Sequence, residues 1–573
     1  MGEGSRINTG DPYRVLLTET LPYEIPVIFE NEGLYKFYKE YEKERIEVSA
    51  PASESVPEIL KDALNLNNRD SEQKTIPYMY QISKGFDSYR ELYVVHPSNQ
   101  RMFVDYYDIY KDLILYSVNK SKFSLRYPKR VSSSEYKSSK NEKFYEIMEG
   151  GAVDVAGEDL YDKFSSTYFA YKKYNLLYKF FESSDFLRLE KKYRFMTSMD
   201  VSRCFDSIYT HSISWAVKDK GYVKSNLFNG PVYAGFDDEF DKIIRCGNDN
   251  ETNGIVIGPE YSRIFAEIIF QRIDLNIYTS LEGEGLKSGV DYSIKRYVDD
   301  IYIFSKSKDV ETRVFETTVK ELWKFKFRIN ESKTKRSERP YVTSRSKGII
   351  ELRSRMNDLL NNGFEEIEYD DVKIYKPKPL RNYHKVSTVY IKNIKSCWYL
   401  LDSSDGSFSS YVISSFLNQI QKTVLGFNTF IEIESEVSKK EAYLNDIVSW
   451  FLLAIEVSSY CYLLSPKVSE SFKFSRPLVE IKRFVDISAR DSKDLIEHKI
   501  YEVVNHILQD ELNSGKPCGI ETLNLLIVLS EVSGSYKIDQ EKLIDIIYGG
   551  SSEANYFSII TALYIANRVS EYS

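Results

Sequence analysis

Two adjacent aspartates, Asp299 and Asp300, stand in a Tyr-Val-Asp-Asp tetrapeptide at residues 297–300. Apolar, strand-forming residues flank them at 292–296 and again at 301–304. This pattern predicts a β-hairpin with both acids at its tip, where they stay hydrated. Neighbouring carboxylates can hold metal ions for phosphoryl transfer, although an acidic hairpin tip alone is usually only a solvated turn.

Two upstream segments carry residues of the same kind of chemistry. Residues 193–199 read as a strand that ends in Asp200, and the aromatic Phe205 follows five positions later. Residues 254–258, Gly-Ile-Val-Ile-Gly, read as a glycine-rich turn. After the turn, apolar residues recur at helical spacing, at Ile264, Phe265, Ile268 and Ile269. The sequence therefore predicts a strand with a terminal acid, a turn before a helix, and an acidic hairpin, in that order.

In order and spacing, these three segments resemble motifs A, B and C of the palm domain of reverse transcriptases. The resemblance covers roughly residues 75–345 and implies an α+β palm-and-fingers fold that polymerises dNTPs. Two Mg²⁺ ions about 4 Å apart would hold the attacking 3′-oxygen and the triphosphate. The resemblance assigns the metal ligands to Asp200, Asp299 and the backbone carbonyl of Val201, and places Asp300 beside the primer end. Three clustered acids repel one another, so metal binding and site formation should be coupled.

Other positions acquire roles from the same resemblance. Phe205 matches the aromatic residue that excludes a 2′-hydroxyl and so implies a DNA product, although a plain core aromatic would also fit. Lys333 matches the motif D lysine near the phosphates, and its alternative is a solvated lysine in a basic run. The resemblance also assigns Gly258 and Ser262 of motif B, and Arg126 of the fingers, to nucleotide binding.

One position departs from most templated reverse transcriptases. A glutamine usually precedes the second glycine of motif B and supports the nascent base pair, whereas this chain has Ile257. Ile257, the segment 262–264 and the run 206–213 resemble the bacterial abortive-infection and defence-associated reverse transcriptases. His211 in that run is interpreted as a structural residue that caps or packs a helix. This narrower resemblance implies antiphage defence.

The C-terminal part of the chain is predicted to be helical. Residues 438–441 read as a capping box before a buried stripe over 444–455, and another amphipathic helix covers 496–508. Further helices are expected near 523–529, 543–547 and 557–565. The predicted organisation is an N-terminal extension at 1–75, fingers and palm at 76–345, a connecting region at 346–410, and an all-α helical-repeat (HEAT-like) domain at 411–573. This last domain would replace the usual thumb.

Charge separates the two halves of the chain. The net charge is −8, and residues 431–573, with 22 acidic and 14 basic side chains, account for all of it. A protein that grips a long duplex usually has a basic excess, which is missing here. The basic run 324–339, with aromatic residues between its charges, could follow a short single strand or could be an ordinary solvated edge.

Tyrosine is abundant, at 46 of 573 residues. Because a phenol can serve as the first hydroxyl in DNA synthesis, and abortive-infection enzymes as a group carry DNA attached to their own protein, a tyrosine is a candidate primer. The leading hypothesis is untemplated, protein-primed DNA synthesis. One alternative is the copying of a dedicated non-coding RNA. Another is a defence scaffold that binds a phage or host protein and whose polymerase site is vestigial.

The remaining features concern location and assembly. The five cysteines are far apart and show no metal-ligand spacing. With no secretory segment and no apolar run near the length of a membrane span, the sequence predicts a cytoplasmic protein without membrane contact. Helical repeat faces commonly mediate self-association, so a homo-oligomer is expected.

Overall fold

The computed structural model describes residues 5–6, 10–18, 24–29, 31–47, 64, 74–85, 88–132, 137–138, 167–172, 174, 176–226, 235–341, 344–369, 372–399, 407–513, 518–532, 536, 538–548 and 555–568. The chain forms two compact units. Unit 1 comprises residues 1–22, 30–80 and 91–341, and unit 2 comprises residues 23–29, 81–90 and 342–573. The hairpin of β2 (Tyr78–Gly85) and β3 (Ser88–Val94) contributes residues to both units.

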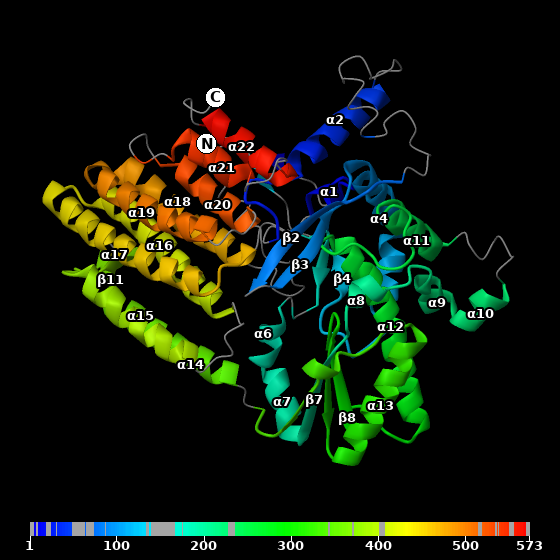
Figure 1. Cartoon of the computed structure of the whole chain (residues 1–573). Coiled ribbons are helices and arrows are strands. Elements are labelled where there is room, and N and C mark those ends of the chain that lie inside the picture. Colours follow the sequence, from blue (N-terminus) through cyan, green and yellow to red (C-terminus); the bar gives the residue numbers. More distant parts are fainter. Residues whose placement is uncertain are drawn as a thin grey trace. The chain divides into compact units, whose positions relative to one another are not determined.

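Unit 1 contains an antiparallel sheet of order β10-β7-β9-β8, and Figure 1 labels its strands β7 and β8 in the lower part of the view. Its strands are β7 (Phe195–Asp200), β8 (Tyr292–Tyr297), β9 (Asp300–Ser305) and β10 (Lys335–Glu338). The predicted hairpin is confirmed as β8–β9, and the strand predicted to end in Asp200 is β7. The register places Asp200 opposite Asp300. Two segments about a hundred residues apart thus bring their acids to one end of the sheet.

Both faces of this sheet are buried at β8 and β9, which explains why these strands are so apolar, whereas the edge strand β10 is polar and largely exposed. Side chains alternate along a strand, and in β9 Ile301 and Ile303 join the main core cluster of unit 1. Tyr302 and Phe304 point the other way, into a smaller aromatic cluster. Burial on both sides fixes the register, because a shift by one residue would exchange the two faces.

The helices described in unit 1 are α1 (Arg14–Thr18), α2 (Glu32–Glu47), α4 (Pro97–Ser117), α6 (Leu177–Phe181), α7 (Ser184–Lys192), α8 (Cys204–Ser207), α9 (Ser212–Lys218), α10 (Lys220–Ser225), α11 (Phe236–Cys246), α12 (Glu260–Gly283) and α13 (Lys308–Lys324). The helix predicted after the glycine-rich turn is confirmed as α12. Most of its side chains are buried, which accounts for its apolar residues on several sides. Helix α13 packs against both α12 and the sheet.

The rest of unit 1 is built from short elements. Strands β4 (Pro128–Val131) and β6 (Phe169–Tyr171) pair antiparallel, and so do β1 (Ser5–Arg6) and β5 (Lys137–Ser138). A 3-10 turn, η2 (Glu331–Lys333), precedes β10. Of these elements, η2 packs against β7.

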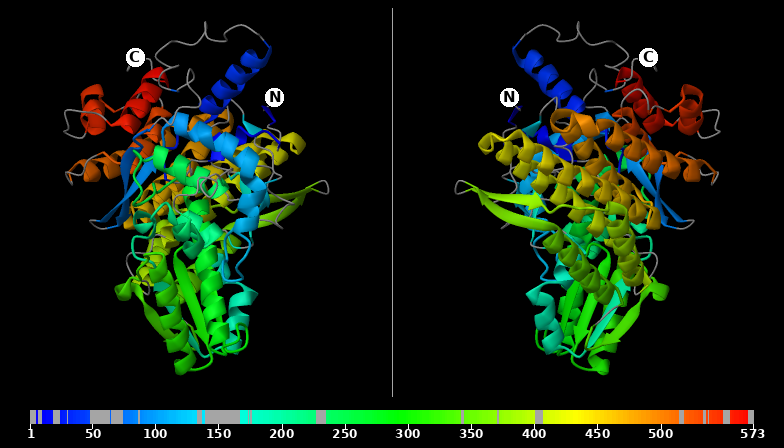
Figure 2. Two further views of the ribbon diagram at one scale, coloured as in Figure 1. Left: turned by 90° about the vertical axis from the view of Figure 1, so that its right-hand side faces the viewer. Right: turned by 90° about the vertical axis from the view of Figure 1, so that its left-hand side faces the viewer.

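Unit 2 is mainly helical. Its described elements are α14 (Ser344–Gly363), β11 (Phe364–Tyr369), β12 (Val372–Pro377), α15 (Tyr383–Tyr399), α16 (Ser407–Ile433), α17 (Val437–Leu464), α18 (Val468–Ser488), η3 (Arg490–Ser492), α19 (Lys493–Asn513), α20 (Ile520–Ser530), α21 (Gln540–Tyr548) and α22 (Tyr556–Arg568). Helix α16 packs on α17 and α18, α18 on α20, and α20 on α22. Figure 2 shows β11 and β12 as a hairpin that extends beyond these helices. The predicted connecting region thus consists of folded elements of unit 2.

Two expectations about α17 are corrected by the structure. No capping box forms, because the helix begins at Val437 and the Ser438 hydroxyl donates to the Glu436 carboxylate. The prediction that the chain has no apolar run near the length of a membrane span was also wrong. Within the described residues, α17 is long and apolar enough to cross a membrane, and its most apolar stretch has a mean hydropathy of 1.7. That stretch is 72% buried inside the fold, as expected of a core helix.

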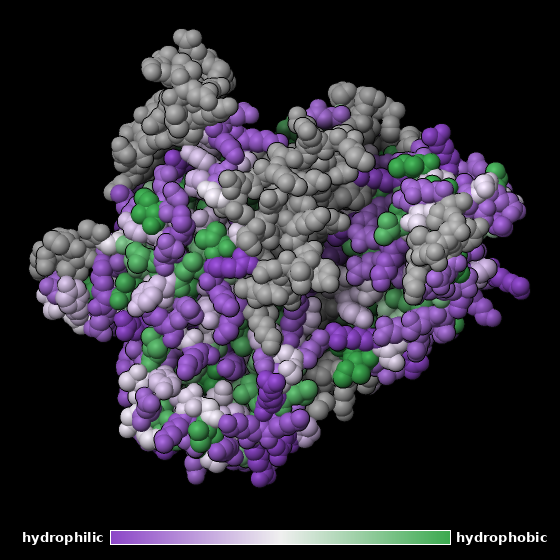
Figure 3. All heavy atoms as spheres, turned by 180° about the vertical axis from the view of Figure 1, so that it is seen from behind, coloured by the Kyte–Doolittle hydropathy of each residue, from purple (hydrophilic) through white to green (hydrophobic). Residues whose placement is uncertain are grey.

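On the surface shown in Figure 3, apolar side chains are scattered among polar ones.

Candidate active site

Backbone hydrogen bonds join the two acid-bearing segments and the segment around 328–330 at one end of the sheet. The amide of Val201 donates to the carbonyl of Asp299 at 3.3 Å, and the amide of Asn330 donates to the carbonyl of Asp200 at 2.8 Å. The amide of Ser202 donates to the carbonyl of Arg328 at 2.8 Å. The segments that resemble motifs A, C and D are therefore fixed to one another through their main chains, and the carboxylate-bearing side chains share one place.

The carboxylates of this site are electrostatically crowded. Burial, together with the charges of Asp299 and Asp200, raises the pKa of Asp300 to about 7, against the opposing charge of Lys333. The ammonium of Lys333 donates to Oδ2 of Asp200 at 2.9 Å, and this hydrogen bond raises the pKa of Lys333. The structure thus places Lys333 directly at the acids, and its predicted contact with the nucleotide phosphates stays a prediction.

The glycine-rich turn before α12 is covered by strand β3. The amide of Tyr93 donates to the carbonyl of Ile257 at 2.8 Å. Gly258 has a φ of +131°, and a Cβ built there would lie 2.9 Å from the carbonyl oxygen of Tyr93. Only a residue without a side chain fits this approach. Gly258 is therefore required by the packing of β3, whether or not a nucleotide also contacts its backbone.

Phe205 connects motif A to the same turn. Its carbonyl accepts a hydrogen bond from the amide of Ile255 at 3.0 Å, and its half-buried side chain packs against the core of unit 1. Gly254, at φ +91°, allows a close approach to the backbone of Asp206. These contacts join Phe205 to the glycine-rich turn, and its role beside the nucleotide sugar stays a prediction.

Ser262 and Arg126 are both buried, and their predicted contacts with the nucleotide stay predictions. Ser262 is fully buried in α12, so its side chain has no surface to offer a ligand. Arg126 is 6% exposed, pairs with Glu260 at 3.3 Å and lies 4.1 Å from the centre of the Tyr171 ring. The hydroxyl of Tyr171 also donates to Glu260. In both cases burial, which residue type alone does not reveal, decides the position.

Arg263 is a residue near the site that the sequence did not identify. It pairs with Glu260 at 3.0 Å from the first turn of α12. Burial raises the pKa of Tyr297, whereas the charges of Arg126 and Arg263 lower it and that of Asp300 raises it further. Both arginines are therefore close enough to affect the hydroxyl beside the acidic turn. The basic residue in the first turn of the helix after motif B was the available signal.

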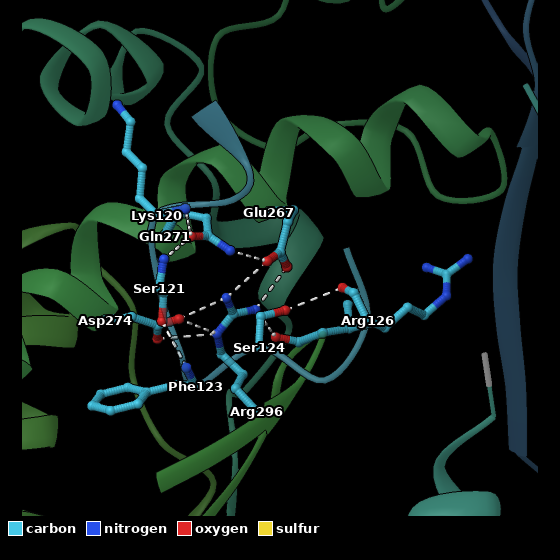
Figure 4. A network of polar contacts seen from close by, with 10 residues as sticks. Lys120, Ser121, Phe123, Ser124, Arg126, Glu267, Gln271, Asp274 and Arg296 are labelled. Carbon is cyan, nitrogen blue, oxygen red and sulfur yellow. Dashed lines mark hydrogen bonds and ion pairs between the residues drawn. The ribbon is translucent and has the colours of Figure 1, made fainter. Parts of the chain in front are cut away.

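Arg296, directly before Tyr297, is a second residue missed from the sequence. It is completely buried and pairs with Glu267 and Asp274 of α12 (Figure 4). Burial lowers the pKa of Arg296, but the charges of Asp274 and Glu267 outweigh this and raise it above its ordinary value. The available signal was a charge on the inward face of a strand, in line with the buried Tyr292 and Ile294.

His211 packs against neighbouring side chains and does not cap helix α9 with its side chain. Its Nδ1 lies 2.9 Å from Oδ2 of Asp241, and its ring meets Tyr209 edge-on at 5.1 Å. It stands at the N-cap of α9 without a side-chain capping bond. These contacts agree with the structural role expected for it.

The donor chemistry of the site fits a hard divalent cation, although the side chains do not form a closed cage. No cluster of three or more His, Cys, Asp or Glu side chains in the described part of the chain is arranged to hold a metal ion as it stands. Burial and the neighbouring carboxylates of Asp299 and Asp200 raise the pKa of Asp300, and the Lys333 ammonium bonded to Asp200 opposes this effect. Carboxylate and backbone carbonyl oxygens are the ligands that such cations prefer.

Comparison with known proteins agrees with this geometry. Residues 157–400 match the family model described as "Reverse transcriptase (RNA-dependent DNA polymerase)". The chain therefore carries a reverse transcriptase domain, and the enzyme class of that domain is nucleotidyltransferase. No curated protein sequence matches the chain.

Solved structures with some similarity include telomerases from two yeasts. Telomerase from Candida albicans, with a fragment of telomeric RNA, has 11% identity and a TM-score of 0.28, and the match covers 76% of this chain and 62% of that one. Apo telomerase from Candida tropicalis has 11% identity and a TM-score of 0.30, with 77% and 73% covered. The chain thus spans about three fifths of the length of the first of these telomerases. Likeness at this level says nothing about function.

Proposed function

We propose that this protein is a Mg²⁺-dependent DNA polymerase of the reverse transcriptase type. The observation that carries the proposal is the register of β7 against β9, which places Asp200 opposite Asp300 with Asp299 in the adjoining turn. Asp200, Asp299 and the backbone carbonyl of Val201 would hold the ions. Bound Mg²⁺ would neutralise the triphosphate and activate the attacking oxygen.

The residues of the chain have separate tasks in this proposal. Asp300 is the acid nearest the primer end, and Phe205 limits the space beside the sugar of the incoming dNTP. The Lys333 ammonium, held by Asp200 at 2.9 Å, is placed to exchange that partner for a phosphate oxygen. A positioned cation can offset charge on the leaving pyrophosphate or donate a proton to it.

A nucleic-acid partner is supported by a group of three lysines, Lys220, Lys224 and Lys326, here called the lysine cluster. The Lys220 ammonium lies 4.3 Å from the centre of the Trp215 ring, and the Lys326 ammonium lies 4.2 Å from that of Tyr209. Burial lowers the pKa of Lys220, and the charges of Lys224 and Lys326 lower it further. Within the described residues, none of the three pairs with a carboxylate. Crowded cations beside aromatic rings suit the phosphates of a single strand.

We further propose that synthesis is untemplated and primed by a tyrosine of the protein. Ile257 supports the first point: its carbonyl is bonded to β3, and its apolar side chain cannot make the polar contact that supports a templated base pair. The availability of exposed tyrosines supports the second. Tyr116 and Tyr399 have relative exposures of 69% and 90%, and neither is singled out as the primer.

The cellular role that we propose is bacterial antiphage defence of the abortive-infection kind, by a cytoplasmic homo-oligomer. All five cysteines are free thiols, which suits a reducing compartment. The successive packed helices of unit 2 support a HEAT-like repeat domain in place of a thumb. Helix α22 exposes Tyr556, Ile559 and Leu563 at helical spacing, and exposed apolar residues of this kind suit self-association.

A single experiment separates these possibilities. Purified protein is treated with nuclease, repurified, and given Mg²⁺ and labelled dNTPs, with Asp299→Asn protein as the control. Untemplated, protein-primed synthesis predicts labelled DNA that stays with the protein through denaturation and is released by protease. Its base composition should follow nucleotide supply, because stacking and shape discriminate bases weakly.

The other outcomes identify the rival functions. If nuclease silences the enzyme and one copurifying RNA restores a defined product, the protein copies a dedicated RNA. If neither treatment yields incorporation, but Asp299→Asn protein still supports defence in cells, the protein acts as a scaffold that binds a phage or host protein.

A further inference from the structure

All five N–H groups of the buried Arg296 guanidinium have acceptors. Nε and Nη2 donate to the carboxylate of Asp274 at 2.8 to 3.2 Å, and Nη1 and Nη2 donate to that of Glu267 at 2.8 and 3.0 Å. The remaining N–H, on Nη1, donates to the carbonyl of Val298 at 3.1 Å. The guanidinium is thus held by two carboxylates of α12, and its second Nη1 hydrogen reaches the turn that carries Asp299 and Asp300.

The acceptors of Arg296 are anchored independently of it. Glu267, Gln271 and Asp274 lie on one face of α12, at i, i+4 and i+7 (Figure 4). The side-chain Nε2 of Gln271 donates to the Glu267 carboxylate at 2.8 Å. The side-chain Oε1 of Gln271 accepts from the backbone amides of Lys120 and Ser121 at 2.9 and 2.5 Å. A carboxylate held in this way cannot follow the guanidinium if the guanidinium moves.

The main chain of Arg296 is held as firmly as its side chain. Its amide donates to the carbonyl of Phe123 at 2.8 Å, and its carbonyl accepts from the amide of Leu125 at 2.7 Å. The guanidinium carbon lies 4.9 Å from the centre of the Phe270 ring. Arg296 therefore joins three segments, β8, α12 and the loop after α4, at one buried point.

The residue that receives the last N–H is strained. Val298 has a φ of +56°, a left-handed conformation that β-branched residues rarely adopt, because Cβ approaches the following carbonyl. Such a conformation persists only where the surroundings impose it, and strain of this kind concentrates at active sites. The bond from Arg296 to the Val298 carbonyl is a contact able to impose it.

We propose that Arg296 is a positioning residue that holds Val298 in its left-handed conformation and thereby fixes Asp299 and Asp300 opposite Asp200. This inference rests on the proposed polymerase function. It also couples the acidic turn to α12, because the carboxylates that orient the guanidinium both belong to that helix. A purely structural ion pair would stabilise unit 1 without determining the rate of the chemical step.

The test uses Arg296→Lys, alone and combined with Val298→Gly. Lysine keeps the positive charge but lacks the guanidinium N–H that reaches the Val298 carbonyl, so the turn is free to relax. We expect a fall in kcat for dNTP incorporation of about tenfold or more, with KM for dNTP changed less than about threefold. Adding Val298→Gly should restore part of kcat, because glycine adopts a positive φ without strain and no longer needs to be held.

The matched control is Arg245→Lys. Arg245 also pairs with a carboxylate of unit 1, Asp241 at 3.0 Å, but within the described residues its guanidinium bonds to Asp241 and Asn250 and not to the turn that carries Asp299 and Asp300. It should lose stability with kcat unchanged. If Arg296→Lys protein does not fold, Glu267→Gln replaces it, since this change keeps the Asp274 pair and weakens the hold on Nη1. A smaller fall in kcat, again partly restored by Val298→Gly, is then expected.

A second readout is independent of activity. Amide hydrogen exchange at Asp299 and Asp300 should be faster in Arg296→Lys than in the wild type, and unchanged in Arg245→Lys. Wild-type kcat in the arginine variant, loss without rescue by Val298→Gly, or unchanged exchange would each overturn the positioning role. Absence of incorporation by the wild-type protein would instead overturn the proposed polymerase function, and the exchange measurement would still decide the inference.

Discussion

Replacing Gly258 by alanine tests the close approach between the glycine-rich turn and strand β3. The added Cβ would lie 2.9 Å from the carbonyl oxygen of Tyr93, which is backbone and cannot rotate away. Alanine would also have to adopt a φ of +131°. We therefore expect the turn and β3 to separate, with loss of the 2.8 Å hydrogen bond from the Tyr93 amide to the Ile257 carbonyl.

The expected cost has two parts. A side chain in this backbone conformation costs about 1–3 kcal/mol. Loss of one backbone hydrogen bond costs about 0.5–1.5 kcal/mol. Gly258→Ala should therefore lower the free energy of unfolding of unit 1 by about 2–4 kcal/mol. Gly285→Ala is the matched control, because Gly285 has a φ of +82° but no atom within 4 Å of its built Cβ, so only a strain of about 1–2 kcal/mol applies.

The assay is denaturant unfolding monitored by hydrogen exchange of the β9 amides. These amides report on unit 1 alone, which is needed because the two units need not unfold together. Incorporation of dNTPs is measured in parallel, and KM should rise for Gly258→Ala alone, because β3 no longer covers the turn. Equal destabilisation by Gly258→Ala and Gly285→Ala would refute the reasoning, since it would show that β3 yields without cost.

Other predictions concern the chemistry directly. Asp299→Asn should abolish nucleotide incorporation with an unchanged melting temperature, because one carboxylate fewer leaves the ions underneutralised; substantial activity in a folded variant would exclude Asp299 as a ligand. Phe205→Ala should raise the ratio of ribonucleotide to deoxyribonucleotide incorporation, whereas a general loss at constant ratio would indicate a core role only. Changing the lysine cluster to glutamine should weaken binding of single-stranded DNA and lower its salt slope by up to about 2, as expected when about three phosphate contacts are lost; an unchanged slope would place the strand elsewhere.

Local features of the site could be predicted from the sequence. The strand ending in Asp200, the hairpin carrying Asp299 and Asp300 and the helix after the glycine-rich turn were each predicted and are present as β7, β8–β9 and α12. Side-chain alternation and turn chemistry depend on residues a few positions apart, so these elements are encoded locally. Helices α17, α19, α20, α21 and α22 of unit 2 were identified from their apolar spacing for the same reason, whereas α14, α15, α16 and α18 were not predicted individually.

Helix ends and burial were less well predicted. The supposed capping box failed because Glu436, outside the predicted motif, competes for the Ser438 hydroxyl. The buried stripe over 444–455 in α17 was predicted, but the length of its apolar run was underestimated because polar residues interrupt it. The sequence did not reveal that Ser262 and Arg126 are buried, and their expected place at the nucleotide stays a prediction. Residue type alone does not say which side of an element will be covered.

The sequence by itself determined which residues can do the chemistry and which strand, turn or helix carries each of them. Only the tertiary structure decided how they meet: Asp200 opposite Asp300, Lys333 on Asp200, and Tyr93 against Gly258. It also revealed Arg296, whose carboxylate partners on α12 lie 22 and 29 positions away in the chain. The physical reason is that a contact between distant segments depends on the packing of the whole unit, whereas strand, turn and helix preferences act between near neighbours in the chain.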